Sequence, residues 1–234
     1  MIFIIFAISD LHLSETTEKP MDIFGEAWAD HTARLKKNWC ALVGEEDTVI
    51  IPGDISWGMN LREALADFLL IDALPGKKII AKGNHDYWWE TASKTMRFFD
   101  ENGISTIRVL HNNAYEIEGK IICGSKGYFP DPGQSASYNE KIMARETARL
   151  EFSLRCGEKL GGGERLVFLH YPPALKSYAA EGLMDVMKRY GVSRCFYGHL
   201  HGQSQRSALL GLCDGIEFSL ISADFIIFAP IPIK

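Results

Sequence analysis

The sequence predicts an α/β fold in which buried strands alternate with amphipathic helices. Short, continuous apolar runs, such as residues 2–8 and 77–81, are typical of strands covered on both faces. Segments with apolar residues at helical spacing follow several of these runs, and Gly, Pro and Asn mark the breaks between them. No repeat, low-complexity tract or linker interrupts the 234 residues, so we expect one domain over residues 1–234.

The first half of the chain predicts three strand–turn–helix units. Their strands are residues 2–8, 48–52 and 77–81, and their helices are residues 30–43, 61–74 and 90–100. Asn60 is the expected N-cap of the second helix, and Asn102-Gly103 is the expected end of the third. A mixed loop over residues 14–29 separates the first strand from its helix.

The second half predicts shorter strands, two helices and a β-rich tail. The strands are residues 106–110, 114–117, 120–124, 165–169 and 193–197, and the helices are residues 138–156 and 183–190. A loop rich in turn formers covers residues 125–137, and a hairpin turn is expected at Asp214-Gly215. Three glycines at 161–163 are interpreted as a linker or helix stop, because no Gly-Lys-Ser/Thr follows them to form a nucleotide loop.

Composition narrows the class of protein. The net charge of -5 gives no support for nonspecific electrostatic binding of nucleic acid. A local basic patch is still compatible with this charge. The five cysteines are odd in number and lack CxxC spacing, which favours reduced thiols in the cytoplasm over disulfides or a zinc knuckle. Residues 1–8 lack the features of a signal peptide, and no apolar segment approaches the ~20 residues of a membrane helix. We therefore expect a soluble, cytoplasmic protein without a membrane partner.

Polar side chains follow five of the apolar runs, at the points where the strands end. Five of the seven histidines lie in these turns. In alternating α/β folds the carboxyl ends of neighbouring strands converge on one crevice, so these groups are expected to face one point. The candidates are Asp10, His12, Asp54, Asn84, His170, His199 and His201, with His85 and Asp86 just beyond them.

Each of these residues taken alone has an ordinary explanation. A single histidine at a strand end is most often a hydrogen-bonded surface residue, and a single Asp or Asn is most often a turn or cap residue. Five successive strand ends of this kind instead indicate a metal site. Seven ligands exceed the four of one tetrahedral site and suit two divalent ions that share a carboxylate. Oxygen and imidazole ligands without thiolate suit manganese, iron, zinc or nickel, and this ligand set does not discriminate among these metals.

The motifs resemble those of the calcineurin-like metallophosphoesterase superfamily in order and spacing. They are Asp10-x-His12, Gly53-Asp54, Gly83-Asn84-His85-Asp86, His170 and Gly198-His199-x-His201. The resemblance implies a four-layer α/β/β/α sandwich with two mixed sheets and a binuclear centre. It assigns Asp10, His12 and His201 to one ion. It assigns Asn84, His170 and His199 to the other, with Asp54 between the ions. His85, paired with Asp86, would face the substrate phosphate.

The expected activity is the hydrolysis of a small phosphoric ester. A hydroxide between the ions would attack phosphorus in line, and His85 would stabilise the phosphoryl oxygens or protonate the leaving alkoxide. Protein Ser/Thr phosphatases have Gly-Asp-x-x-Asp-Arg-Gly as the second motif and Gly-Asn-His-Glu as the third. Here Gly53-Asp54 is followed by Ile55-Ser56-Trp57-Gly58 and the third motif ends in Asp86, which counts against a protein phosphatase. A cyclic-nucleotide phosphodiesterase or nuclease, and a catalytically silent metal-binding scaffold, are the alternatives.

Aromatic residues next to the ligand motifs are candidates for substrate contact. Trp57 could form a wall for a flat leaving group or pack its own loop. For Trp88 and Trp89, packing of the segment after the third strand is the preferred interpretation. Residues 14–29 and 125–137 are expected to form rims over the site. The sequence leaves open the physiological substrate, the native metal, the preference for monoester or diester, and the oligomeric state.

Overall fold

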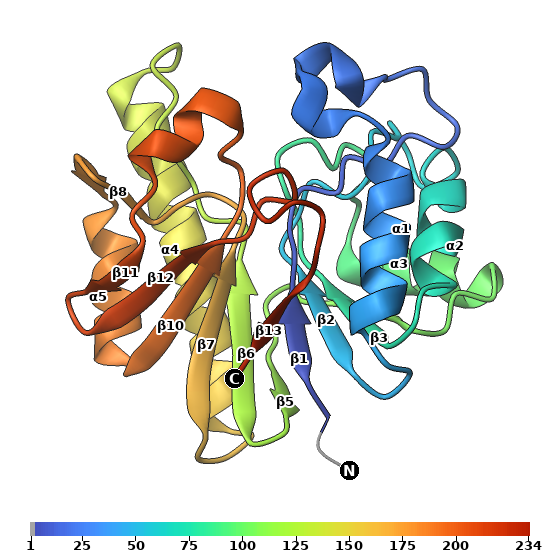
Figure 1. The fold of residues 1–234 in the computed structure, drawn as a ribbon. Coiled ribbons are helices and arrows are strands. Elements are labelled where there is room, and N and C mark those ends of the chain that lie inside the picture. Colours follow the sequence, from blue (N-terminus) through green and yellow to red (C-terminus); the bar gives the residue numbers. More distant parts are fainter. Residues whose placement is uncertain (1–2) are drawn as a thin grey trace.

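The computed structural model describes residues 3–234 and contains two large β-sheets that face each other. Figure 1 shows helices α1–α3 outside one sheet and α4 and α5 outside the other. This arrangement is the four-layer α/β/β/α sandwich that the resemblance implied, and the predicted fold class is confirmed.

The first sheet has five strands in the order β13-β1-β2-β3-β4. These are β1 (Ile5–Ala7), β2 (Thr48–Ile51), β3 (Lys77–Ile80), β4 (Ile107–Val109) and β13 (Ile231–Ile233). Strands β1 to β4 pair in parallel, and β13 adds an antiparallel edge beside β1. Parallel neighbours need crossover connections. Helices α1 (His31–Leu42), α2 (Leu65–Asp72) and α3 (Ala92–Glu101) provide them.

The second sheet has six strands in the order β11-β12-β10-β7-β6-β5. They are β5 (Tyr115–Ile117), β6 (Lys120–Ser125), β7 (Glu164–Leu169), β10 (Val192–Tyr197), β11 (Gly211–Cys213) and β12 (Ile216–Leu220). The four central strands are parallel, and β5 and β11 are antiparallel edges. Helices α4 (Ala136–Glu158) and α5 (Glu181–Arg189) cover the outer face. A separate hairpin joins β8 (Ala174–Leu175) to β9 (Tyr178–Ala179).

Three apolar layers hold the sandwich together, because successive side chains of a strand point to opposite faces. In β1, Ile5 and Ala7 join the layer between the sheets, whereas Phe6 joins the layer beneath α1–α3. Phe168 and Phe196 stack in the middle layer with ring centroids 5.0 Å apart. The continuous apolar runs in the sequence follow from this double coverage.

Several element bounds differ from those predicted. Helix α2 begins at Leu65 rather than at residue 61, because residues 61–64 form turns and the Asn60 side chain accepts hydrogen bonds from two of their amides. Helix α4 begins two residues early, where the Ser135 hydroxyl accepts a hydrogen bond from the Tyr138 amide. The first strand is shorter than predicted, and residue 2 of the predicted range lies outside the described residues. The hairpin turn at Asp214-Gly215 is confirmed.

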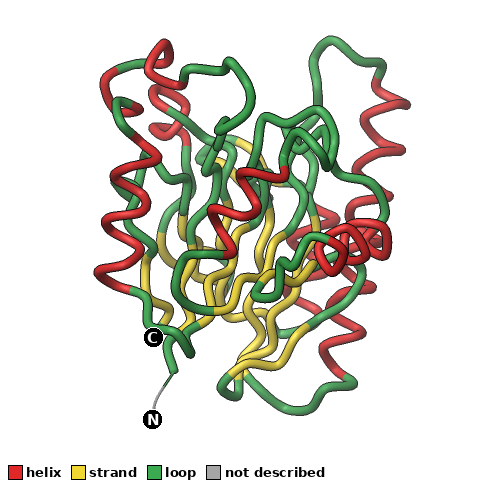
Figure 2. Tube along the Cα trace, turned by 90° about the vertical axis from the view of Figure 1, so that its right-hand side faces the viewer, coloured by secondary structure: helices red, strands yellow, loops and turns green. Residues whose placement is uncertain are grey.

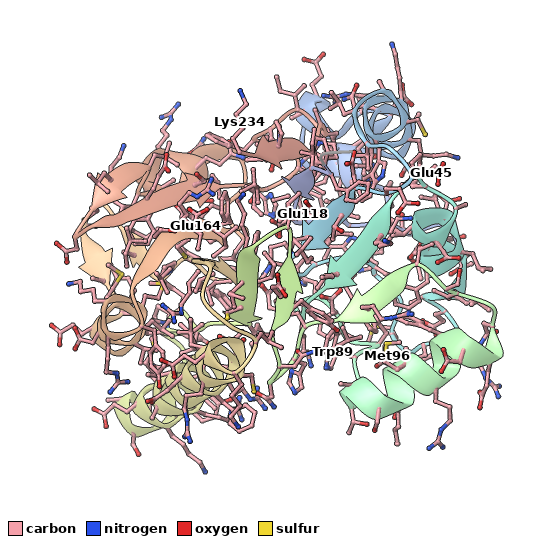
Figure 3. All side chains as sticks on the ribbon, turned by 90° about the horizontal axis from the view of Figure 1, so that it is seen from below. Glu45, Trp89, Met96, Glu118, Glu164 and Lys234 are labelled. Atoms are coloured by element: carbon pink, nitrogen blue, oxygen red, sulfur yellow. The ribbon has the colours of Figure 1, made fainter. Side chains whose placement is uncertain are left out.

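The parallel strands of both sheets end at the same edge of the sandwich. Figure 2 shows loops gathered over this edge. Figure 3 shows the opposite edge, where Glu45 precedes β2 and Glu164 begins β7. The sheets are joined near the loop edge by two hydrogen bonds: the Ser9 amide donates to the Ile221 carbonyl at 2.8 Å, and the Ala223 amide donates to the Ser9 carbonyl at 2.9 Å. The turns that follow β1 and β12 are thereby brought together.

Candidate metal centre

The turn after β1 places Asp10 and His12 in a buried position at the loop edge. Both residues adopt left-handed backbone conformations, with φ of 60° and 46°. Asp54 after β2 and His199 after β10 do the same, with φ of 51° and 71°. Such conformations cost free energy for residues other than glycine and gather at functional sites. The fold therefore holds four of the seven candidate ligands in conformations that the chain does not favour locally.

Glycines allow these turns to approach one another. A methyl group added at Gly83 would collide with the carboxylate and the amide of Asp54. One added at Gly198 would collide with the carboxylate of Asp10 and the side chain of Ser9. Gly83 lies outside the left-handed region of φ, so the position requires space rather than unusual backbone freedom.

Asn84 connects two histidines that come from the other sheet. Its Oδ1 lies 2.6 Å from Nε2 of His170 and 2.9 Å from Nδ1 of His199. His170 follows β7 and His199 follows β10, and the His199 amide donates to Asp10 Oδ2 at 3.0 Å. An amide oxygen flanked by two imidazoles is an arrangement that could hold one cation between three ligands.

Asp10 and Asp54 lie at the middle of the remaining ligands. Asp10 Oδ1 lies 3.4 Å from Nε2 of His201 and 3.8 Å from Nδ1 of His170. Asp54 Oδ2 lies 3.7 Å from Nε2 of His12 and 3.4 Å from Nε2 of His170. Two sets of side chains converge closely enough to hold an ion, and both contain Asp10. One set adds His12 and His201, and the other adds Asp54 and His170.

Two imidazole nitrogens without hydrogen-bond partners in the described part of the chain indicate that these residues can bind divalent metal ions. Nδ1 of His170 and Nε2 of His201 are buried and have no hydrogen-bond partner among residues 3–234. A buried imidazole nitrogen without a partner is costly unless it binds something. Both atoms face the carboxylate of Asp10. The donor set of carboxylate, amide and imidazole groups suits a divalent transition metal.

Burial and neighbouring charges shift the pKa values of several of these side chains. Burial raises the pKa of Asp54 well above its ordinary value, and the charges of Asp10 and Asp86 raise it further. Burial lowers the pKa of His12 to about 3 and that of His199 to about 4, so both are neutral and able to bind a metal at pH 7. Burial alone would lower the pKa of His201, but the charges of Asp10 and Asp224 outweigh it and raise that pKa to about 10.

Asp86 does not have the role that the sequence predicted. Its buried carboxylate accepts hydrogen bonds from the amides of Gly83, Asp54 and Ile55 at 2.7–2.9 Å, and from Trp88 Nε1 at 3.0 Å. The His85 ring instead has its Nδ1 3.4 Å from the Tyr87 hydroxyl. The expected pairing of His85 with Asp86 is therefore wrong, because four other donors occupy the carboxylate. Asp86 fixes the turns after β2 and β3.

His85 faces a cavity of about 380 Å³ that opens beside His12 and His201. Trp57 lies against two of these imidazoles, with ring centroids 5.0 Å from His12 and 4.6 Å from His85. The loop over residues 14–29 also lines the cavity, through Met21, Phe24, Ala27 and Trp28. This loop contains two short 3₁₀ helices, η1 (Met21–Phe24) and η2 (Glu26–Trp28), and it rims the cavity as expected.

The loop over residues 125–137 begins on the other side of the centre. The Lys126 carbonyl accepts hydrogen bonds from the amides of His170 and Tyr171 at 3.2 and 2.9 Å. The Tyr171 ring lies 4.3 Å from that of His199 between centroids. Trp88 and Trp89 are buried in the core beneath the helices, as the packing interpretation predicted.

Sequence reasoning missed two residues of the site. Asp224, in the turn after β12, accepts a hydrogen bond from His201 at 2.9 Å and another from the Gln205 side chain at 2.8 Å. Trp28 lies edge-on to His12 and to His201 at 5.5 Å. Asp224 also follows a strand pattern, over residues 216–223, in which apolar and polar residues largely alternate, so a search of all strand ends could have identified it. Trp28 lies in a mixed loop that carries no such pattern.

Comparison with known proteins gives a family match over most of the chain. A sequence model described as calcineurin-like phosphoesterase matches residues 3–203. The "Gene 66 protein" of Mycobacterium phage L5 is 37% identical over 78 residues, which are 33% of this chain and 37% of that protein. The chain therefore matches little more than a third of the length of this curated relative.

Solved structures share the fold at low sequence identity. A phosphopantetheinyl hydrolase from Mycobacterium tuberculosis is 17% identical with a TM-score of 0.56, over 94% of this chain and 88% of that one. The protein AQ665 from Aquifex aeolicus is 17% identical with a TM-score of 0.54, over 99% and 96%. The protein TT1561 of Thermus thermophilus is 11% identical with a TM-score of 0.52, over 100% and 99%. Among residues 3–234, no helix combines the length and apolarity needed to cross a membrane.

Proposed function

Because the chain belongs to the calcineurin-like phosphoesterase family, we propose that it is a metal-dependent hydrolase of small phosphoric esters. One observation carries most of the proposal. Side chains from five strand ends, spread over residues 10 to 201, form one continuous set of contacts in which two buried imidazole nitrogens lack partners. A packed core would gain nothing from such a set without a cation.

We assign the ligands to two neighbouring ions. Asp10, His12 and His201 would hold one ion, and Asn84, His170 and His199 would hold the other. Asp54 would contribute to both. This assignment is supported by Asp54 Oδ2, which lies within 3.7 Å of His12 and 3.4 Å of His170, one histidine from each group. Manganese, iron, zinc or nickel suits the mixed donor set.

Metal ions held by these residues would lower the pKa of a bound water and offset negative charge on the phosphoryl oxygens. The reaction proposed is in-line attack of water on phosphorus. One P–O bond forms, the bond to the alcohol breaks, and the alcohol oxygen takes up a proton. Asp54 keeps one oxygen directed away from the metal centre, since Oδ1 accepts a hydrogen bond from the His85 amide at 2.8 Å. This bond fixes the turn that presents His85.

We assign His85 to the phosphoryl group or the leaving oxygen. Its ring lines the cavity and is half-buried between Trp57 and Tyr87, so it can donate a hydrogen bond toward a substrate in that cavity. Trp57 offers a flat apolar surface next to it, where the alcohol portion of an ester could pack. Lys19, whose Nζ lies 5.5 Å over the Trp57 ring, adds positive charge at the rim.

The direct test is turnover of p-nitrophenyl phosphate and bis-p-nitrophenyl phosphate by chelator-treated protein after each metal is added back. We expect hydrolysis of at least one ester only when metal is present. Preference for the diester would favour the phosphodiesterase or nuclease alternative. Stoichiometric metal binding without hydrolysis of either ester would support the silent scaffold and overturn the proposal.

A further inference from the structure

A cluster of cationic side chains lies beside the candidate metal centre, where β3 and β6 end. Lys82, Lys126 and Arg149 line a hollow together with His111 and the carboxylate of Glu146. The hollow has a volume of about 20 Å³, which holds one oxygen-sized atom. A larger anion would therefore rest across its mouth, with one oxygen directed inward.

Positive charge exceeds the negative charge that faces it. Glu146 is fully buried and pairs with Arg149 at 2.7 Å and with Arg145 at 3.5 Å. The ammonium groups of Lys82 and Lys126 have no ion pair or hydrogen bond among residues 3–234. Four cations thus surround one carboxylate, in a chain whose net charge is -5. Asp86 adds a second negative charge near Lys82, although its oxygens accept hydrogen bonds from backbone amides, and the cations still outnumber the two carboxylates.

The two lysines are half-buried, which makes their unbalanced charge costly. Both side chains are only partly accessible to solvent. Buried charges of one sign are tolerated when an opposite charge compensates them. A bound anion would supply that charge, and the geometry leaves both ammonium groups free to donate hydrogen bonds to it.

The cluster is continuous with the metal centre. Lys82 stands two residues before Asn84, and the Lys126 carbonyl accepts the hydrogen bond from the His170 amide. The Lys126 ammonium lies 5.5 Å over the Tyr171 ring, which in turn packs on the His199 ring. A molecule whose phosphoryl group lies at the metal centre could therefore extend past Tyr171 to Lys126.

We propose that Lys82, Lys126 and Arg149 bind a second phosphate group of the substrate, carried on the alcohol that hydrolysis releases. This inference rests on the proposed function and adds the substrate class, which is a bisphosphorylated compound such as a nucleoside or sugar bisphosphate. A phosphate dianion matches the excess positive charge better than a carboxylate. Its several oxygens can accept hydrogen bonds from lysine and arginine together.

The first experiment measures binding without metal or turnover. Inorganic phosphate is titrated by calorimetry into chelator-treated wild type, Lys126→Gln, Lys126→Arg and the control Lys37→Gln, which removes an exposed lysine of α1. We expect one phosphate per chain, binding weakened at least about tenfold in Lys126→Gln, and near-normal binding in Lys126→Arg and Lys37→Gln. Because Lys126 makes no ion pair in the fold, Lys126→Gln removes none. Equal binding by all four proteins would overturn the anion site.

The second experiment identifies the source of the phosphate. Metal-loaded wild type is titrated with adenosine 3′,5′-bisphosphate and with adenosine 5′-monophosphate. We expect at least about tenfold tighter binding of the bisphosphate and loss of this preference in Lys126→Gln. Equal affinities, with phosphate binding intact in the first experiment, would indicate a site for free phosphate and overturn the substrate class. Failure to hydrolyse either p-nitrophenyl phosphate or bis-p-nitrophenyl phosphate would instead overturn the proposed function and leave the anion site standing.

Discussion

Oδ1 of Asp224 lies 2.9 Å from Nδ1 of His201, on the opposite side of the imidazole from Asp10. The Gln205 side chain and the Gly202 amide donate to the other oxygen of Asp224 and fix its orientation. A carboxylate in this place selects the histidine tautomer whose Nε2 is free to bind a metal. Asp224 is therefore a positioning residue for His201.

Replacing Asp224 should weaken metal binding without unfolding the protein. We expect Asp224→Ala to lower the affinity for the ion held by His201 by about 10–100-fold, because the imidazole loses its orientation and part of its basicity. Competition with a chelator measures this affinity. Asp185→Ala, an exposed position on α5, is the matched control. Equal affinities in the two variants would remove the positioning role.

Asp54→Asn should lose metal while the fold persists. The amide keeps an oxygen for the His85 amide bond but removes the negative charge that lies between the two groups of ligands. Elemental analysis of the purified variant should show less metal per chain than wild type, with unchanged circular dichroism. A full complement of metal in this variant would argue against Asp54 as a ligand.

His85→Asn should keep metal and lose turnover. The ring lines the cavity but belongs to neither group of converging ligands. We expect kcat for p-nitrophenyl phosphate to fall by roughly 10²-fold or more, the scale of general acid catalysis. Metal content is measured on the same sample. Turnover at the wild-type rate would exclude His85 from the reaction.

Gly83→Ala should disturb the metal centre by steric overlap alone. The added methyl group would press on the Asp54 carboxylate and amide, which are held by further hydrogen bonds. We expect a loss of about 1–3 kcal/mol in the free energy of unfolding, the range for overpacked sites, together with weaker metal binding. Gly162→Ala is the control, because nothing lies within 4 Å of its added methyl group. Urea denaturation of both variants compares them.

The metal-free protein should lose stability at alkaline pH through His201. Burial alone would lower the pKa of His201 below its ordinary value of 6.5. The charges of Asp10 and Asp224 outweigh burial and raise this pKa to about 10. A raised histidine pKa stabilises the fold fully below pH 6.5, and this contribution is lost as the pH rises toward 10. The stability difference between wild type and His201→Gln in chelator should therefore be larger at about pH 6 than at about pH 9. If the stability difference between the two proteins grew with pH, the ion pairs of His201 with Asp10 and Asp224 would be contradicted.

Apolar runs and the polar residues after them could be read from the sequence because they reflect local rules. A strand covered on both faces must be apolar throughout, and a buried polar residue at its end needs a partner. These rules pointed to Asp10, Asp54 and His170 from residue order alone. The motif resemblance then supplied the four-layer arrangement and the division of ligands between two ions.

Tertiary structure decided the contacts that depend on which turns meet. Asp86 is chemically suited to orient His85, yet the packing of the turns after β2 and β3 directs three backbone amides to its carboxylate. Asp224 reaches His201 because the turns after β1 and β12 are joined through Ser9. Lys82 follows β3 of the first sheet, Lys126 follows β6 of the second and Arg149 lies on α4, so the packing of the two sheets and of α4 brings them to one hollow. The residue type determines which groups a side chain can bind. The packing of the elements determines which of these groups lies close enough to be bound.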